Sequence, residues 1–144
     1  MAGYSETPLA KKLGIKEGFR VAMIGAPAGF RGELAGLPDK VKFVTSTATS
    51  LDVVLYFVKL QRELTESFPR LAAKLAPAGM LWIAWPKKAS GVPTDLSDHS
   101  VREIGLEAGL VDVKVCAVNH IWSGLKFVIR LKDRPRGGNP SKQA

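Results

Sequence analysis

The chain has 144 residues, of which 46% are apolar and 24% are charged, and its formal net charge is +8 at pH 7. These proportions are typical of one folded domain. No apolar run approaches the ~20 residues that a membrane span needs, which excludes a membrane-spanning helix. The single cysteine, Cys116, excludes an internal disulfide and suits a reducing compartment. With no apolar signal core at the N-terminus, we expect a soluble cytoplasmic protein: one domain over residues 1–132 and a basic tail over 133–144.

The first half of the chain predicts a short helix, three strands and a longer helix. Residues 9–13 form a short amphipathic piece. Mostly apolar runs predict strands at 19–25, 41–45 and 52–58, and a turn at 25–29 follows the first of them. Strands that are apolar throughout are typical of a sheet covered on both faces. Apolar residues then recur at helical spacing from Leu60 to Leu75, and Pro69 predicts a break in that helix.

The second half predicts a strand, a helix and a closing hairpin. A turn at 76–79 leads to a buried strand at 80–85, and a helix is expected at 97–108. Two alternating strands follow, at 111–117 and 125–131. Their connection is too short for a parallel crossover, so we expect them to pair antiparallel. The predicted fold is therefore an α/β domain: a mostly parallel sheet with helices on both faces and a C-terminal antiparallel hairpin.

The segment that leaves the strand at 80–85 carries the candidate functional residues. In an open α/β sheet, ligands collect outside the carboxyl ends of the parallel strands. The topology brings that segment, the turn at 25–29 and the entry to the last strand to one edge of the sheet. The predicted ligand-binding residues are Gly25, Gly29, Lys87, Lys88, Ser90, Thr94, Asp95, His120, Trp122 and Ser123. Cations, hydroxyls, an imidazole and an indole favour an anionic ligand such as a phosphate or a carboxylate.

Structural roles compete with this interpretation. Lys87 and Lys88 also fit a solvated strand end, and Thr94, Asp95 or Ser97 also fit caps of the next helix. His120 also fits an ordinary loop histidine. Cys116 is better read as a packed thiol than as a nucleophile, since nothing nearby in sequence activates it. Two histidines and one cysteine, widely separated, give no metal-ligand spacing.

Three segments resemble a trimmed methyltransferase-type Rossmann domain. Residues 18–25 (GFRVAMIG) are similar to its lead-in and first strand, residues 75–83 (LAPAGMLWI) to its L-x-P-G-G-x-L-x-I segment, and the terminal hairpin to its closing strand pair. A more specific resemblance is to the "domain of unknown function 3052" family. It rests on YSETPLAKKLGIKEG, WPKKASGVPTDL and GLVDVKVCAVNHIWSGLKFV, and covers residues 4–131. That family carries no assigned reaction, so the resemblance implies a fold.

The methyltransferase resemblance implies S-adenosylmethionine as a cofactor, but the motif residues differ. Met23 stands at the position of an acidic residue in the first strand, and Pro27 replaces the central glycine of the turn. Proline has a fixed φ and no backbone donor. The next strand ends in Val44, Thr45 and Ser46, where the family carries a carboxylate for the ribose hydroxyls.

Three hypotheses follow, and whether the protein is an enzyme stays open. The first is a noncatalytic or cryptic small-ligand module that binds an anion, acting alone or through a protein partner. The second is an atypical S-adenosylmethionine-dependent methyltransferase. The third is weak nonspecific nucleic-acid binding through the basic tail, since a basic field attracts polyanions. The cofactor is unknown, and no membrane partner is expected.

Overall fold

The computed structural model describes residues 7–134 and contains a six-stranded sheet in the order β2-β1-β3-β4-β6-β5. The strands are β1 (Arg20–Ile24), β2 (Lys42–Phe43), β3 (Leu51–Phe57), β4 (Leu75–Pro86), β5 (Leu110–Ala117) and β6 (Trp122–Ile129). Strands β2, β1, β3 and β4 are parallel, whereas β6 pairs antiparallel with both β4 and β5. The predicted fold class, including the antiparallel hairpin, is confirmed.

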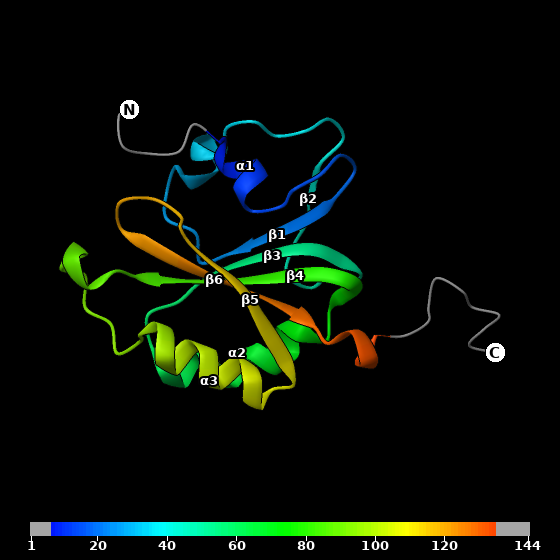
Figure 1. Cartoon of the computed structure of the whole chain (residues 1–144). Helices are drawn as coiled ribbons and strands as arrows, with labels where there is room; N and C mark the ends of the chain where they lie inside the picture. Colours follow the sequence, from blue (N-terminus) through cyan, green and yellow to red (C-terminus); the bar gives the residue numbers. More distant parts are fainter. Residues whose placement is uncertain (1–6, 135–144) are drawn as a thin grey trace.

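Helical elements cover both faces of this sheet (Figure 1). Helices α2 (Gln61–Ala72) and α3 (Asp98–Glu107) lie against one face, and α1 (Leu9–Lys12) with the 3₁₀ turn η1 (Phe30–Glu33) lies against the other. Two more 3₁₀ turns, η2 (Lys88–Ser90) and η3 (Leu131–Asp133), follow β4 and β6. The cover is thin on the α1 side, because a single helical turn and loops replace full helices there.

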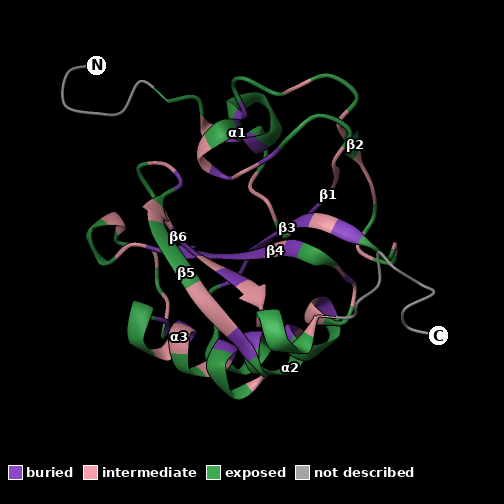
Figure 2. Ribbon diagram, turned by 45° about the vertical axis from the view of Figure 1, so that its right-hand side comes forward, coloured by how far each residue is buried: buried purple, intermediate pink, exposed green. Residues whose placement is uncertain are grey.

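The core lies on both faces of the two central strands. Figure 2 shows β3 and β4 as the most continuously buried strands, and residues 53–58 and 81–86 are all buried. On the α2 side, Leu64 and Phe68 pack with Leu81 and Ile83; on the α1 side, Leu13 and Phe30 belong to the same cluster as Trp82. Burial on both faces explains why these strands have apolar runs without alternation.

The predicted break at Pro69 is wrong, because α2 runs through this residue to Ala72. A proline in a helix removes the hydrogen bond to the carbonyl four residues earlier. That carbonyl belongs to Thr65, which is exposed, as is Pro69 itself. Water can therefore satisfy the carbonyl, while the buried neighbours Phe68 and Leu71 hold the helix against the sheet.

The predicted turn at 76–79 is instead part of β4, which begins at Leu75. Leu51 pairs with Leu75, but Val53 pairs with Met80, so the register advances two residues on β3 and five on β4. The segment is an irregularity inside a strand. Turn-forming residues mark such a bulge as readily as a true chain reversal.

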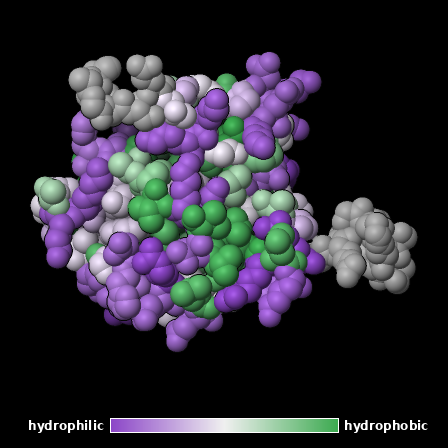
Figure 3. Space-filling view, in the orientation of Figure 1, coloured by the Kyte–Doolittle hydropathy of each residue, from purple (hydrophilic) through white to green (hydrophobic). Residues whose placement is uncertain are grey.

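The outer strand β5 leaves one edge of the sheet unpaired within the described residues. Apolar surface gathers near the middle of the face seen in Figure 3, where β5 lies in front in Figure 1. Val113 and Val115 of this strand are 55% and 53% exposed. None of the helices in residues 7–134 is long and apolar enough to cross a membrane.

Candidate functional site

The carboxyl end of β4 and the start of β6 meet at one edge of the sheet, as the topology predicted. Trp85 pairs with Ser123 and Pro86 with Trp122. Beyond the last pair, the amide of Lys87 donates a hydrogen bond to the carbonyl oxygen of Ile121 at 2.7 Å. The lysine-bearing segment and the turn before β6 are therefore neighbours.

One hollow of about 450 Å³, here called the turn hollow, opens between the turn after β1 and the end of β3. Its lining residues are Gly25, Pro27, Phe57, Val58, Lys59, Leu60, Glu63, Pro93 and Trp122. Gly25 has a φ of +70°, and a Cβ there would lie 2.7 Å from the carbonyl oxygen of Phe57. Only glycine lets this turn approach β3 so closely.

Trp122 forms part of the wall of the turn hollow rather than a free lid. It is 7% exposed, and its ring meets that of Phe57 edge-on at 5.1 Å between centroids. Phe57 in turn meets Phe30 edge-on at 4.8 Å. The indole is therefore held by the core on the α1 side, with only its margin available to a ligand.

A second hollow of about 370 Å³, here called the lysine hollow, lies beside the first. Its lining residues are Trp85, Pro86, Lys87, Lys88, Thr94, Leu96, Ser97, Asp98, Val115 and Ser123. Four of the predicted site residues thus share one space: Lys87, Lys88, Thr94 and Ser123. The lining is rich in hydrogen-bond donors, and its only carboxylate is that of Asp98.

The indole N–H of Trp85 is a further hydrogen-bond donor in the wall of the lysine hollow. Trp85 is 5% exposed, and no residue within 7–134 accepts a hydrogen bond from its Nε1. This nitrogen is not among the described side-chain atoms that are buried without a partner, so it reaches the open space of the hollow, where water or a ligand can accept from it. An unpaired donor in the wall of a hollow is therefore suited to an acceptor brought by a ligand.

Thr94 and Asp95 tie the loop at 91–97 to the end of β3. Thr94 Oγ1 donates to the carbonyl oxygen of Lys59 at 2.6 Å, and Asp95 Oδ1 accepts from the amide of Gln61 at 2.7 Å. Asp95 thus satisfies the N-terminus of α2, while Ser97 caps α3 in a capping box with Ser100. The capping interpretation holds for Ser97, and Asp95 caps a helix other than the one expected.

Four of the predicted site residues line neither hollow: Gly29, Ser90, Asp95 and His120. Gly29 precedes η1. Ser90 closes its own turn, with Oγ donating to the Lys87 carbonyl and accepting from the Val92 amide. His120 is exposed in the turn before β6. The structure therefore divides the predicted site into two adjacent hollows and places these four residues around them.

Cys116 and the metal-binding residue types give no further site. Burial raises the pKa of the Cys116 thiol, although Lys12, Lys114 and Lys126 act in the opposite direction. A raised pKa keeps the sulfur protonated and unreactive near neutral pH. Within residues 7–134, no cluster of three or more His, Cys, Asp or Glu side chains is placed to hold a metal ion.

The sequence analysis did not include Glu63 and Asp98 in the site. Each lies in the first turn of a helix that begins at this edge of the sheet. The sequence could have placed both residues at this edge, because a helix that follows a parallel strand begins where that strand ends. Acidic residues are, however, so common in first turns that they mark helix starts rather than sites.

Comparison with solved structures defines the class of fold. No family model matches the chain, and no curated protein sequence matches it. A SAM-dependent methyltransferase from Aquifex aeolicus superposes with a TM-score of 0.63 at 17% identity, covering 83% of this chain and 86% of the other. A TehB-like SAM-dependent methyltransferase from Corynebacterium glutamicum gives 0.56 at 10% identity, with 90% and 91% covered.

A third similar structure is the magnesium protoporphyrin IX methyltransferase of Synechocystis PCC 6803 with bound SAM. Its TM-score is 0.56 at 10% identity, over 84% of this chain and 74% of that one. At such identities the likeness establishes the fold alone. The chain has a methyltransferase-type Rossmann-like fold, and the resemblance to the domain of unknown function 3052 family stays a prediction.

The carboxyl edge does not fit the methyl donor that this fold class implies. The turn after β1 contains Pro27, which offers no backbone N–H to a carboxylate or phosphate. The segment after β2 carries Thr45 and Ser46, and the Thr45 hydroxyl is hydrogen-bonded to that of Thr47 at 2.8 Å. Neither residue supplies the carboxylate that would accept two ribose hydroxyls.

Proposed function

We propose that this domain binds a small anionic ligand in the lysine hollow and does not transfer a methyl group. The observation that carries the proposal is the convergence of available donors around one space: Lys87, Lys88, Ser123 and the indole N–H of Trp85, which has no acceptor among residues 7–134. Charge-assisted hydrogen bonds are about twice as strong as neutral ones. A ligand with several anionic oxygens satisfies this lining better than a neutral molecule.

The size and rim of the hollow narrow the ligand class. Its volume of about 370 Å³ lies toward the small end of ligand pockets. Apolar surface from Val115 and Leu96 accompanies the donors, so the ligand has a carbon skeleton as well as a charged group. The Asp98 carboxylate at the rim disfavours a second negative charge there and favours a hydroxyl.

Titration of the full chain with inorganic phosphate, nucleotides and acyl-coenzyme compounds tests this proposal. A ligand that binds the folded state raises the thermal midpoint, and calorimetry then gives its affinity. The double variant K87A/K88A is expected to bind at least about tenfold more weakly, since two charge-assisted contacts are lost.

The matched control is K16A/K42A, which removes the same charge at two exposed positions outside both hollows. It is expected to bind as the wild type does. Equal binding by wild type and K87A/K88A would place the ligand elsewhere. Equal weakening in both double variants would show that net charge alone attracts the anion.

The alternative of an atypical methyltransferase is favoured by the fold shared with SAM-dependent enzymes. Calorimetry with S-adenosylmethionine and S-adenosylhomocysteine separates it from the first proposal. Saturable binding that survives K87A/K88A would support it and place the donor outside the lysine hollow. If calorimetry detects no heat of binding at millimolar concentrations of either compound, the methyltransferase alternative is excluded.

Nucleic-acid binding through the predicted tail remains a separate proposal. Most of that tail, residues 135–144, lies outside the described residues. Removal of residues 135–144 should abolish retardation of a DNA or RNA duplex if the tail is responsible. Retention of full binding by the shortened chain would exclude it. A cytoplasmic location and a protein partner likewise stay predictions.

A further inference from the structure

A third hollow lies away from the carboxyl-edge site, in a groove between α2 and the β1 side of the sheet. Its volume is about 300 Å³, and it is lined by Ile24, Ser46, Tyr56, Ser67, Arg70, Leu71 and Lys74. The groove exists because the connection from β2 to β3, residues 44–50, crosses β1 on the α2 side without forming a helix. A loop leaves part of this face of the sheet uncovered.

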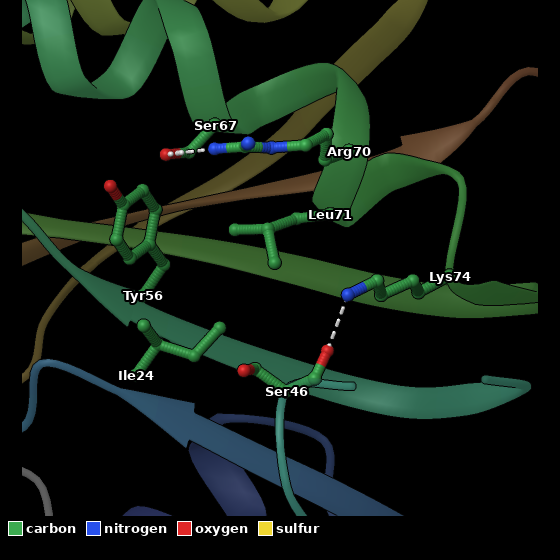
Figure 4. Close-up of a pocket in the computed structure, with 7 residues that line it drawn as sticks. All are labelled: Ile24, Ser46, Tyr56, Ser67, Arg70, Leu71 and Lys74. Atoms are coloured by element: carbon green, nitrogen blue, oxygen red, sulfur yellow. Dashed lines mark hydrogen bonds between the residues drawn. The ribbon is translucent and has the colours of Figure 1, made fainter. Parts of the chain in front are cut away.

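Hydrogen-bond donors approach the groove from both of its walls (Figure 4). Ser67 and Arg70 extend from α2, and Lys74 extends from the segment after α2 toward Ser46. Lys74 Nζ donates one hydrogen bond, to the carbonyl oxygen of Ser46 at 2.6 Å. Since an ammonium group has three donors, two remain for a ligand.

The two cations of the groove have no carboxylate partner. The ion pairs within residues 7–134 join His99 to Glu103 and Arg102 to Asp112, and none involves Arg70 or Lys74. The Arg70 guanidinium donates a long hydrogen bond to Ser67 Oγ at 3.5 Å. No Asp or Glu lines the groove. A cationic pocket without a counter-charge is suited to a negatively charged ligand.

Tyr56 supplies the observation that points to a ligand. This residue is 8% exposed, and its hydroxyl is directed into the groove toward α2 (Figure 4). None of the described residues, 7–134, forms a hydrogen bond with that hydroxyl. The hydroxyl is not among the described side-chain atoms that are buried without a partner, so it reaches the open space of the groove, and a phenylalanine would bury the same ring without it. The hydroxyl therefore lacks a structural role in the isolated chain.

We propose that this groove binds the phosphate group of a small phosphate monoester. Guanidinium, ammonium, phenol and serine hydroxyls are all donors, and a phosphate has three acceptor oxygens to receive them. A carboxylate has only two oxygens and would leave some of these donors without an acceptor. Ile24 and Leu71 form the apolar part of the groove and contact the carbon portion of the ester.

The test is NMR titration of the ¹⁵N-labelled full chain with inorganic phosphate and with phenyl phosphate, each against sodium chloride at equal ionic strength. Saturable amide shifts are expected around Ser46, Ser67 and Lys74, with phenyl phosphate binding more tightly because of its ring. R70A is expected to weaken binding about tenfold, because it removes a charged hydrogen-bond donor. Y56F should weaken binding only several-fold, because the hydroxyl that it removes is neutral and forms a weaker hydrogen bond. Both variants should fold, because Arg70 is exposed with one long hydrogen bond to Ser67, and phenylalanine keeps the ring of Tyr56 that packs in the core.

Two control variants separate this groove from the lysine hollow. R62A removes an exposed arginine from the same helix, outside the groove, and should bind like the wild type. K87A/K88A should leave the shifts at Ser46, Ser67 and Lys74 unchanged even if the carboxyl-edge proposal is correct. The groove proposal is overturned if R70A and Y56F bind as the wild type does, if shifts appear only around Lys87, or if tens of millimolar phosphate produce none.

Discussion

At the scale of single residues, packing at one glycine decides how closely a helix approaches the sheet. Gly105 lies on the buried side of α3, and a Cβ there would be 2.1 Å from Cε2 of Phe127. Phe127 meets Phe68 of α2 edge-on, with 5.1 Å between centroids. One aromatic ring therefore links both helices to β6, and the absence of a side chain at Gly105 makes room for it.

Gly105→Ala is expected to destabilise the fold by about 1–3 kcal/mol, because the added methyl displaces a fully buried ring. Urea unfolding followed by tryptophan fluorescence measures this loss. Gly32→Ala is the control, since nothing lies within 4 Å of a Cβ at that position. If both alanine variants unfold at the same urea concentration, α3 adjusts its distance from the sheet without cost.

At the scale of elements, the N-terminus of α2 depends on a residue from a distant loop. Leu60 at the N-cap position provides no side-chain acceptor. The Asp95 carboxylate, 34 residues further along the chain, accepts from the Gln61 amide instead, and Gln61 Nε2 donates back to the Asp95 carbonyl oxygen at 2.7 Å. The loop at 91–97 is thereby held at the wall of both carboxyl-edge hollows.

Asp95→Ala should lower the free energy of unfolding by about 1 kcal/mol, the usual effect of losing an N-terminal cap. Asp95→Asn keeps an acceptor oxygen and should retain most of the stability. Chemical denaturation of the three proteins side by side measures the difference. Wild-type stability in the alanine variant would mean that water replaces the carboxylate at this helix end.

At the scale of the whole molecule, one buried hydrogen bond attaches the N-terminal segment to the centre of the sheet. Trp82 of β4 is fully buried, and its Nε1 donates to the carbonyl oxygen of Leu13 at 2.9 Å. The bond spans 69 positions of sequence. Ala10, Leu13 and Ile15 pack in the same cluster, so this segment serves as the cover of the α1 face.

Trp82→Phe removes the donor and leaves a buried carbonyl unpaired, which costs about 1–3 kcal/mol. Amides of residues 10–15 should then exchange with deuterium faster than in the wild type. Trp85→Phe is a matched control: it lies on the same strand, faces the other side of the sheet, and its Nε1 has no acceptor within residues 7–134. Unchanged exchange at 10–15 in Trp82→Phe would show that apolar packing alone holds the segment.

The order of elements, the parallel strands and the closing hairpin were determined by the sequence alone, because hydrophobic periodicity and connection length are local properties. The same reasoning brought Lys87, Lys88 and Ser123 to one edge. It failed at Pro69, where buried neighbours hold the helix against the sheet, and at residues 76–79, where turn-forming residues mark an irregularity inside β4.

Only the tertiary structure decided which of the predicted site residues line the same hollow. Asp95 binds a helix end instead of a ligand, Trp122 packs on Phe57, and the predicted site divides into two hollows. The groove of Tyr56, Arg70 and Lys74 had no sequence signal, because its residues lie on separate elements and each is ordinary in its own segment. Long-range packing, which no short motif encodes, brings them together.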